Sequence, residues 1–285
     1  MLFSDANADY KDARYVICGV PFDGTSCCRL GSACAPLEIR KASHYFETYN
    51  PLFDIDLKDI RIHDAGDLAV VKNIDETLSM ISAHADKYIK DEKMPVMLGG
   101  EHSLTLPFAL ACKKKYPELG FVVLDAHLDL REEYRGSRNS HACISRHILE
   151  EVTKKYAAIG IRSGAREEYE YVAENKIKMF SADDVYALGI EKIMQEIRDY
   201  IKGPVYLSID MDAIDPAYAP ALGSPEPYGL TPRDVRDVIS CLAPKIVGFD
   251  LVEIAPAYDS GNTALLGAKL VRDFMAASAK AGLCF

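Results

Sequence analysis

The sequence of 285 residues has no surplus of basic side chains: it carries 33 Lys and Arg against 43 Asp and Glu, a formal net charge of −10. Because binding to nucleic-acid phosphates depends mainly on clustered Lys and Arg, this balance argues against a nucleic-acid-binding protein. The sequence also lacks the roughly 18 consecutive apolar residues of a membrane span, and no cationic start followed by an apolar segment marks a secretory signal. We therefore expect a cytoplasmic protein that binds neither nucleic acid nor a membrane.

Short motifs of other protein classes are missing as well. The sequence contains no C-x-x-C pair, and neither the G-x-x-x-x-G-K-[ST] nor the G-x-G-x-x-G motif of nucleotide-binding loops. Gly99 and Gly100 therefore indicate a close backbone approach rather than a phosphate loop. The cysteines include one adjacent pair and several within apolar runs, so we interpret most as small buried thiols in a reducing compartment. They are Cys18, Cys27, Cys28, Cys34, Cys112, Cys143, Cys241 and Cys284.

Short apolar runs alternate with segments of helical spacing along the whole chain, and hydrophobic residues make up 49% of it, enough for a large core. We predict buried parallel strands at residues 15–20, 95–98, 121–124, 157–161, 177–180, 205–209 and 246–251. Predicted helices include residues 75–90, 140–155, 181–201, 231–242 and 263–280, with Thr231 and Pro232 marking a helix start. No linker or repeat divides the chain. We therefore predict one α/β domain over residues 1–285, with helices on both faces of a mainly parallel sheet.

Metal-ligand side chains follow three of the predicted strands at the point where each strand ends. They occur in the sequences G-G-E-H-S, D-A-H-L-D and S-I-D-M-D. Because successive strand residues alternate faces, ligands two positions apart share a face. In open α/β sheets the ligand lies beyond the carboxyl ends of the strands, which is where these side chains are expected. They are His102, Asp125, His127, Asp129, Asp210 and Asp212.

These six side chains predict a metal site. A carboxylate removed from water costs several kcal/mol even after relaxation, so a bound cation is the expected compensation. Four carboxylates with two imidazoles suit hard to borderline divalent ions, and the predominance of oxygen ligands favours Mn²⁺ over Zn²⁺. The set exceeds the four ligands of one tetrahedral zinc, so we infer two metals. The alternative for any one motif alone is a strand end with solvated Asp residues.

Taken in order, the motifs resemble those of the ureohydrolases, the family of arginases, agmatinases and their relatives. The resemblance extends from about residue 15 to residue 274, through GVPFDGTS, GGEHS, DAHLDLR, SIDMDAIDPAYAPALGSPEP and FDLVEIAPAYD. It implies a three-layer α/β/α fold, a dinuclear centre with two Mn²⁺ per chain, and a homo-oligomer, usually a trimer or hexamer. The implied ligands of one metal are His102, Asp125, Asp129 and Asp210. Those of the other are His127, Asp125, Asp210 and Asp212.

The resemblance also assigns roles around the metals. Metal coordination lowers the pKa of water from about 15.7 toward about 7, and the resulting hydroxide would attack the guanidinium carbon. Asp129 would take the hydroxide proton and pass it to the departing nitrogen. Glu253 would hold the guanidinium through two parallel N–H bonds, and His141 would move protons or contact the substrate. Leu30 and Ala33 stand where the family usually has Pro and Arg, which puts the conformation of that loop in question.

The expected substrate is a small cationic guanidine. The segment after D-A-H-L-D reads REEYRGSRNSHAC and looks more like agmatinases than arginases, so we expect hydrolysis of agmatine to putrescine and urea, a step of polyamine biosynthesis. Glu132 or Glu133 is a candidate contact for the distal ammonium, whereas Arg135 or Arg138 facing the substrate would favour a carboxylate. Guanidinobutyrate, arginine and formiminoglutamate are alternative substrates. A one-zinc, deacetylase-like amidohydrolase and a catalytically silent metal-binding subunit are alternatives from other classes.

Overall fold

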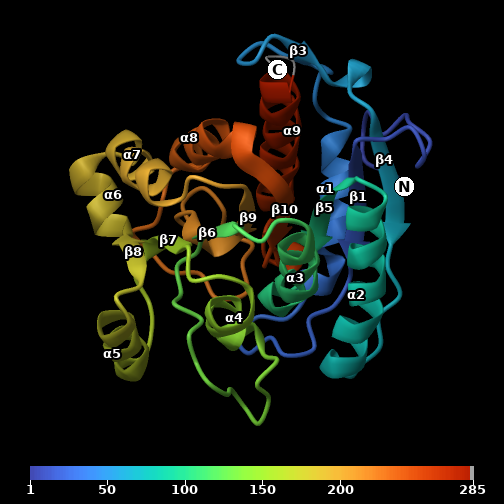
Figure 1. Ribbon diagram of the computed structural model, residues 1–285. Helices are drawn as coiled ribbons and strands as arrows, with labels where there is room; N and C mark the ends of the chain where they lie inside the picture. Colours follow the sequence, from blue (N-terminus) through green and yellow to red (C-terminus); the bar gives the residue numbers. More distant parts are fainter. Residues whose placement is uncertain (283–285) are drawn as a thin grey trace.

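A sheet of eight strands forms the centre of the computed structural model, which describes residues 1–282 (Figure 1). The strand order is β4-β1-β5-β10-β9-β6-β7-β8, and every neighbouring pair is parallel. The strands are β1 (Tyr15–Val20), β4 (Ile62–Asp67), β5 (Met94–Gly99), β6 (Gly120–Leu124), β7 (Tyr156–Ile161), β8 (Lys178–Ser181), β9 (Val205–Asp210) and β10 (Ile246–Val252). Each predicted strand is confirmed to within one or two residues at its ends.

The sequence did not reveal β4, which lies at one edge of the sheet. Its residues read IHDAGD, and only Ile62 and Asp64 are fully buried. An edge strand is not enclosed by neighbours on both sides, so it does not need the continuous apolar run by which we recognised the other strands. A separate two-stranded antiparallel sheet joins β2 (Tyr49–Asn50) to β3 (Ile55–Asp56).

Helices cover both faces of the main sheet, so the predicted three-layer α/β/α fold is confirmed (Figure 1). Side chains alternate between two separate cores: Tyr15 and Ile17 of β1 pack into one, and Val16 and Cys18 into the other. The first core is covered by α1 (Ala35–Ser43), α6 (Ala182–Leu188), α7 (Ile190–Tyr200), α8 (Pro232–Leu242) and α9 (Asn262–Gly282). The second is covered by α2 (Ile74–Lys90), α3 (Thr105–Lys115), α4 (Ile144–His147) and the edge of α5 (Arg166–Asn175).

Two of the predicted helices are interrupted in the structure. The helix predicted over 181–201 is split into α6 and α7 at Gly189, whose φ of 81° is a left-handed value that glycine tolerates best. The helix predicted over 140–155 consists of a 3-10 turn, α4 and a π-helical turn over Ile148–Val152. The start of α8 is confirmed, because the Thr231 hydroxyl accepts a hydrogen bond from the Asp234 N–H and Pro232 occupies the first helical position.

The cysteines are only partly as expected. Cys18, Cys112 and Cys143 are buried, but Cys28 and Cys34 are exposed, so the interpretation of most cysteines as buried was wrong for these two. The seven cysteines within residues 1–282 are all free thiols, and Cys284 lies outside the described residues. Among the helices of the same described range, none combines the length and apolar character needed to cross a membrane.

Candidate metal centre

The strand ends that carry the ligand motifs meet at one edge of the sheet. Strands β5, β10, β9 and β6 are consecutive neighbours in the sheet and all run parallel, so the loops after them lie side by side. The glycines after β5 allow this crowding: a Cβ added to Gly100 would lie 1.9 Å from the Phe22 carbonyl oxygen. The predicted close backbone approach at Gly99-Gly100 is therefore confirmed.

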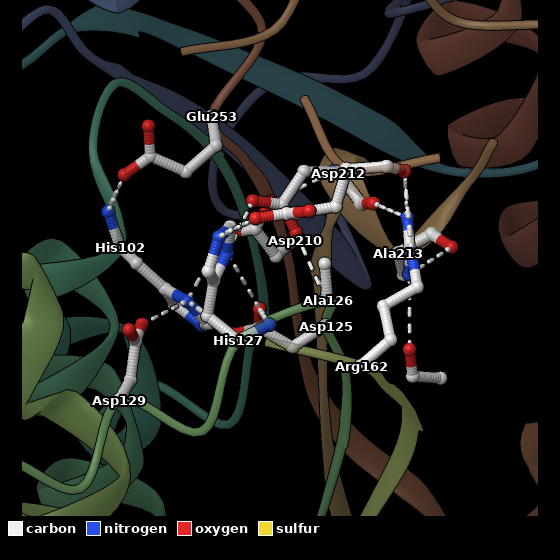
Figure 2. Close-up of polar contacts among 12 residues, drawn as sticks. His102, Asp125, Ala126, His127, Asp129, Arg162, Asp210, Asp212, Ala213 and Glu253 are labelled. Atoms are coloured by element: carbon white, nitrogen blue, oxygen red, sulfur yellow. Dashed lines mark hydrogen bonds and ion pairs between the residues drawn. The ribbon is translucent and has the colours of Figure 1, made fainter. Parts of the chain in front are cut away.

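One group of ligands gathers around the imidazole of His102 (Figure 2). Its Nδ1 lies 3.2 Å from Asp125 Oδ2, 3.2 Å from Asp210 Oδ2 and 3.5 Å from Asp129 Oδ2. On the other side of the ring, His102 Nε2 lies 3.1 Å from the Ser208 hydroxyl, and Ser208 donates its own hydrogen to Asp250 at 2.6 Å. Ser208 can therefore only accept from Nε2–H, which leaves the Nδ1 lone pair of a neutral His102 aimed at the three carboxylates.

A second group shares Asp125 with the first. His127 Nδ1 lies 2.8 Å from Asp212 Oδ2 and 3.7 Å from Asp125 Oδ1. One candidate ligand atom from each of Asp125, His127 and Asp212 lies within 4.8 Å of the others, and the same holds for His102, Asp125 and Asp129. The six predicted ligands thus converge as two groups that share a carboxylate. We call them the His/Asp cluster.

Several properties of the His/Asp cluster fit bound divalent cations. Its four carboxylates are at most 8% exposed, and within residues 1–282 none of them forms an ion pair with Lys or Arg. His102 Nδ1 and Asp125 Oδ2 are buried without a hydrogen-bond partner in this described range. Burial, with repulsion from Asp125, raises the pKa of Asp129 to about 7, and burial with repulsion from Asp212 and Asp125 raises that of Asp210 well above its usual range. A cation would relieve all of these costs, and the oxygen-rich ligand set suits Mn²⁺.

Two of the predicted site residues have left-handed backbone conformations. Asp129 has a φ of 49° and Glu253 a φ of 65°. Such values in residues other than glycine cost of order 1–3 kcal/mol and gather at functional sites. Asp129 lies in the loop after β6 and Glu253 directly follows β10, and both side chains point toward the His/Asp cluster (Figure 2).

Glu253 and His141, predicted to contact the substrate, lie in the wall of a cavity of about 320 Å³ that also reaches His127, Asp129, Asp210 and Asp212. The Glu253 Oε1 accepts a hydrogen bond from the His102 N–H at 2.8 Å, and burial raises the pKa of this carboxyl well above its usual range. Burial lowers the pKa of His141 to about 4, so its imidazole is neutral at pH 7. Six of the eight predicted side chains therefore line one cavity, and the other two, His102 and Asp125, are fully buried.

The structure adds residues that the motifs did not single out. Ser208 and the buried Asp250 are two of them. Asp250 accepts hydrogen bonds from Ser208 and, at 2.7 Å, from the Tyr206 hydroxyl, and so holds the Ser208 hydroxyl beside His102. Arg162 donates to the main-chain carbonyl of Asp212 at 2.7 Å and fixes the turn after β9 (Figure 2). Asp250 could have been noticed in the sequence, because it is a single carboxylate inside the apolar run 246–251. No comparable feature of the sequence marks Arg162.

The acidic residues expected at the substrate's far end are elsewhere. Glu132 and Glu133 are exposed and line a neighbouring cavity, not the one that contains Glu253 and His141. Arg138 also lines that neighbouring cavity and pairs with Glu150 at 3.6 Å. Arg135 Nη2 lies 3.4 Å from the carbonyl oxygen of Cys27. Cys27 belongs to the cavity wall, but Arg135 does not.

The arginines within the main cavity wall are Arg29 and Arg131, which the motifs had not indicated. Tyr134, also in the wall, packs its ring against the Arg131 guanidinium at 5.1 Å and edge-on against His141 at 5.9 Å. The family departures do not reach the cavity: Leu30 has a 61% exposed side chain, and neither Leu30 nor Ala33 belongs to the wall.

Comparison with known proteins agrees with this geometry. The model of the arginase family matches residues 13–277. The agmatinase of Bacillus cereus is 35% identical over 281 residues, which cover 96% of this chain and 95% of that protein. The guanidinobutyrase of Pseudomonas aeruginosa is 35% identical over 282 residues, covering 95% of this chain and 88% of that protein. The crystal structure of agmatine ureohydrolase of Thermoplasma volcanium matches with a TM-score of 0.94 at 41% identity, covering 98% of this chain and 94% of the other. The chain therefore belongs to the arginase family and is a ureohydrolase.

Proposed function

We propose that this protein hydrolyses the guanidino group of agmatine to give putrescine and urea. The observation that supports the proposal is that Glu253 lines the same cavity as four residues of the His/Asp cluster, so that a carboxylate able to bind a guanidinium lies beside the candidate metal ligands. The choice of agmatine is supported by relatives with that activity in their names, including the agmatinase of Pyrococcus horikoshii, 36% identical over 92% of this chain.

Two Mn²⁺ per chain complete the proposed site. His102, Asp125, Asp129 and Asp210 would hold one ion, and His127, Asp125, Asp210 and Asp212 the other. Such a pair supplies a water whose pKa falls from about 15.7 toward about 7 and thus a nucleophile at neutral pH. Asp125, which both ligand groups share, and Asp210, which lies 3.2 Å from His102 Nδ1, would contribute to both metal sites.

The residues in the cavity wall take the remaining roles in the proposal. Glu253 Oε1 already accepts the His102 N–H, so its carboxylate is fixed while accepting the N–H fork of the guanidinium. The Asp129 carboxylate, which lies in the cavity wall, would accept the proton and pass it to the departing nitrogen. His141, neutral at pH 7, provides a second proton acceptor on the wall of the cavity.

A panel of guanidines tests the proposal. The purified protein with added Mn²⁺ is incubated with agmatine, arginine, 4-guanidinobutyrate and formiminoglutamate, and urea is measured, with formamide measured for the last of these. We expect kcat/KM for agmatine to exceed that for each other substrate by at least about tenfold, a difference of about 1.4 kcal/mol in transition-state binding. Equal or better use of arginine or 4-guanidinobutyrate would remove agmatine as the substrate. One zinc per chain together with amide hydrolysis would instead indicate a deacetylase-like enzyme. Bound metal without product from any substrate would indicate a catalytically silent subunit.

A second candidate substrate, 4-guanidinobutyrate, is favoured by the arginines of the cavity wall. Both Arg29 and Arg131 line the cavity, and Arg131 also forms ion pairs at 3.8 Å with Glu167 and Glu168. A guanidinium in the cavity wall attracts a substrate carboxylate and repels a substrate ammonium. An arginine-to-methionine change at position 131 should lower kcat/KM for 4-guanidinobutyrate and spare agmatine if this candidate is right.

We further propose, by resemblance to the family, that residues 1–285 act as a single domain in a homo-oligomer, a trimer or hexamer, in the cytoplasm. Size-exclusion chromatography with light scattering tests the assembly, and a monomer would contradict it.

A further inference from the structure

Glu101 is a buried carboxylate beside the His/Asp cluster that does not belong to it. It precedes His102 in the chain and is 0% exposed, yet its side chain turns toward the loop after β1. There Oε2 accepts the Thr25 N–H at 2.7 Å, and Oε1 accepts the hydroxyls of Thr25 and Ser103, both at 2.6 Å. Every contact of this carboxylate is therefore a donor bonded to it, and the Thr25 hydroxyl hydrogen is committed to Glu101.

Thr25 in turn holds His141. Its Oγ1 accepts the main-chain N–H of His141 at 3.0 Å and lies 3.1 Å from the imidazole Nδ1. Because the only hydroxyl hydrogen of Thr25 points at Glu101, Oγ1 presents a lone pair to Nδ1. A lone pair on Nδ1 would repel it at this distance, so Nδ1 carries the hydrogen. Ser140 Oγ is more distant from Nδ1, at 3.3 Å, and its oxygen can serve as a second acceptor for the Nδ1 hydrogen.

We propose that Glu101 and Thr25 are positioning residues that fix His141 as the Nδ1-protonated tautomer, with the Nε2 lone pair available on the cavity side. The inference rests on the proposed function, because it makes Nε2 of His141 the proton acceptor that faces the substrate. Three observations support it. The ring lines the cavity, Nε2 has no hydrogen-bond partner within residues 1–282, and Nδ1 faces Thr25 on the opposite edge of the ring. The network also ties together the loops after β1, β5 and β6, and the loops after β1 and β6 both line the cavity.

Substitutions at Thr25 test the inference in the Mn²⁺-loaded enzyme. Thr25→Val keeps the shape of the side chain and removes the hydroxyl, so we expect kcat for agmatine to fall by at least about tenfold, as expected for a misplaced acid–base group, with KM changed less than twofold. Thr25→Ser restores the hydroxyl and should recover most of that loss. The control is Thr77→Val. Thr77 lies on α2, away from the site, and its hydroxyl forms hydrogen bonds with the main chain of Val71.

The tautomer itself has a readout that does not depend on turnover. Neutron diffraction from deuterium-exchanged crystals should show a deuteron on His141 Nδ1 directed at Thr25 Oγ1. A deuteron on Nε2 alone, a Thr25→Val enzyme with wild-type kcat, or an equal kcat loss in Thr77→Val would each overturn the inference. Wild-type protein that releases no urea from any guanidine would instead refute the proposed function, while the neutron result would still decide the tautomer.

Discussion

Two sites of buried charge in this protein contain similar residues but are balanced in different ways. In the first, Arg40 donates to both oxygens of Asp64, at 2.8 and 2.9 Å, and also pairs with Asp67. The N–H groups of Phe3 and Gly66 complete the hydrogen bonding of Asp64. We call Arg40, Asp64 and Asp67 the Arg40 cluster. Its fully buried pair is neutralised within the chain by a bidentate interaction.

Within residues 1–282 the His/Asp cluster has no such internal partner. Its four carboxylates lie around two imidazoles, and the Arg162 guanidinium bonds the main-chain carbonyl of Asp212, not its carboxylate. The difference teaches how to separate structural from functional buried charge. The chain neutralises the charges of the Arg40 cluster by itself, whereas it leaves the carboxylates of the His/Asp cluster unbalanced, as a site for bound cations requires.

The largest effect that we expect from the difference between the two clusters is that of removing the metal. Dialysis against a chelator should abolish urea release and lower Tm, because ligand binding to the folded state contributes about 2.7 kcal/mol at a concentration 100-fold above Kd. Added Mn²⁺ should restore both, as measured by urea assay and thermal unfolding. Protein that metal analysis shows to be metal-free, but that retains activity and Tm, would contradict the contrast between the clusters.

A large effect on turnover is expected for Asp129→Asn. Asparagine keeps the shape of the side chain but cannot carry the proton, so kcat should fall about 100-fold or more, while circular dichroism shows a folded protein. Asp67→Asn is the matched control in the Arg40 cluster, and its kcat should be that of wild type. Near-normal turnover in Asp129→Asn at saturating Mn²⁺ would remove the proposed proton role.

The reverse pattern is expected for Arg40→Met. Removal of the arginine leaves Asp64 buried without its partner, so the free energy of unfolding should fall by about 3–5 kcal/mol. The kcat of the folded fraction should not change, because Arg40 lies outside the cavity wall. Denaturant unfolding and urea assays measure the two quantities. A change in unfolding free energy below about 1 kcal/mol would show that this pair is not structural.

The smallest effect is a pH dependence of the metal-free protein. Burial raises the pKa of Asp129 from 3.8 to about 7, so between these values the folded state binds more protons than the unfolded state. Stability therefore falls as pH rises through this window. The Tm of metal-free wild type should drop more between pH 5 and pH 7 than that of metal-free Asp129→Asn, in which the titrating group is absent. Equal drops in the two proteins would show that the pKa of Asp129 is not raised in the folded state.

Much of the fold could be predicted because buried parallel strands carry continuous apolar runs. The run at 15–20 coincides with β1, and the run at 205–209 with all of β9 except Asp210. Strand β4 could not be found in this way, since its exposed edge tolerates the polar sequence IHDAGD. The break at Gly189 was also missed, because the apolar spacing of α6 and α7 continues across it.

The metal ligands could be predicted because strand ends converge whatever the detailed geometry. The contacts around them could not, because they join residues far apart in sequence without any periodic pattern. Thr25 and His141 meet across 116 positions, and His102 and Ser208 across 106. The left-handed backbone of Glu253 left no sign in the sequence either, since the residue type does not report φ.

The count of bound metal ions tests the central claim most directly. Metal-free protein is dialysed against Mn²⁺ at increasing free concentration, and the ions bound per chain are measured by elemental analysis together with urea release from agmatine. The two ligand groups that share Asp125 predict two Mn²⁺ per chain at saturation, with full activity only after the second ion binds. Saturation at one ion per chain with full activity would contradict the account.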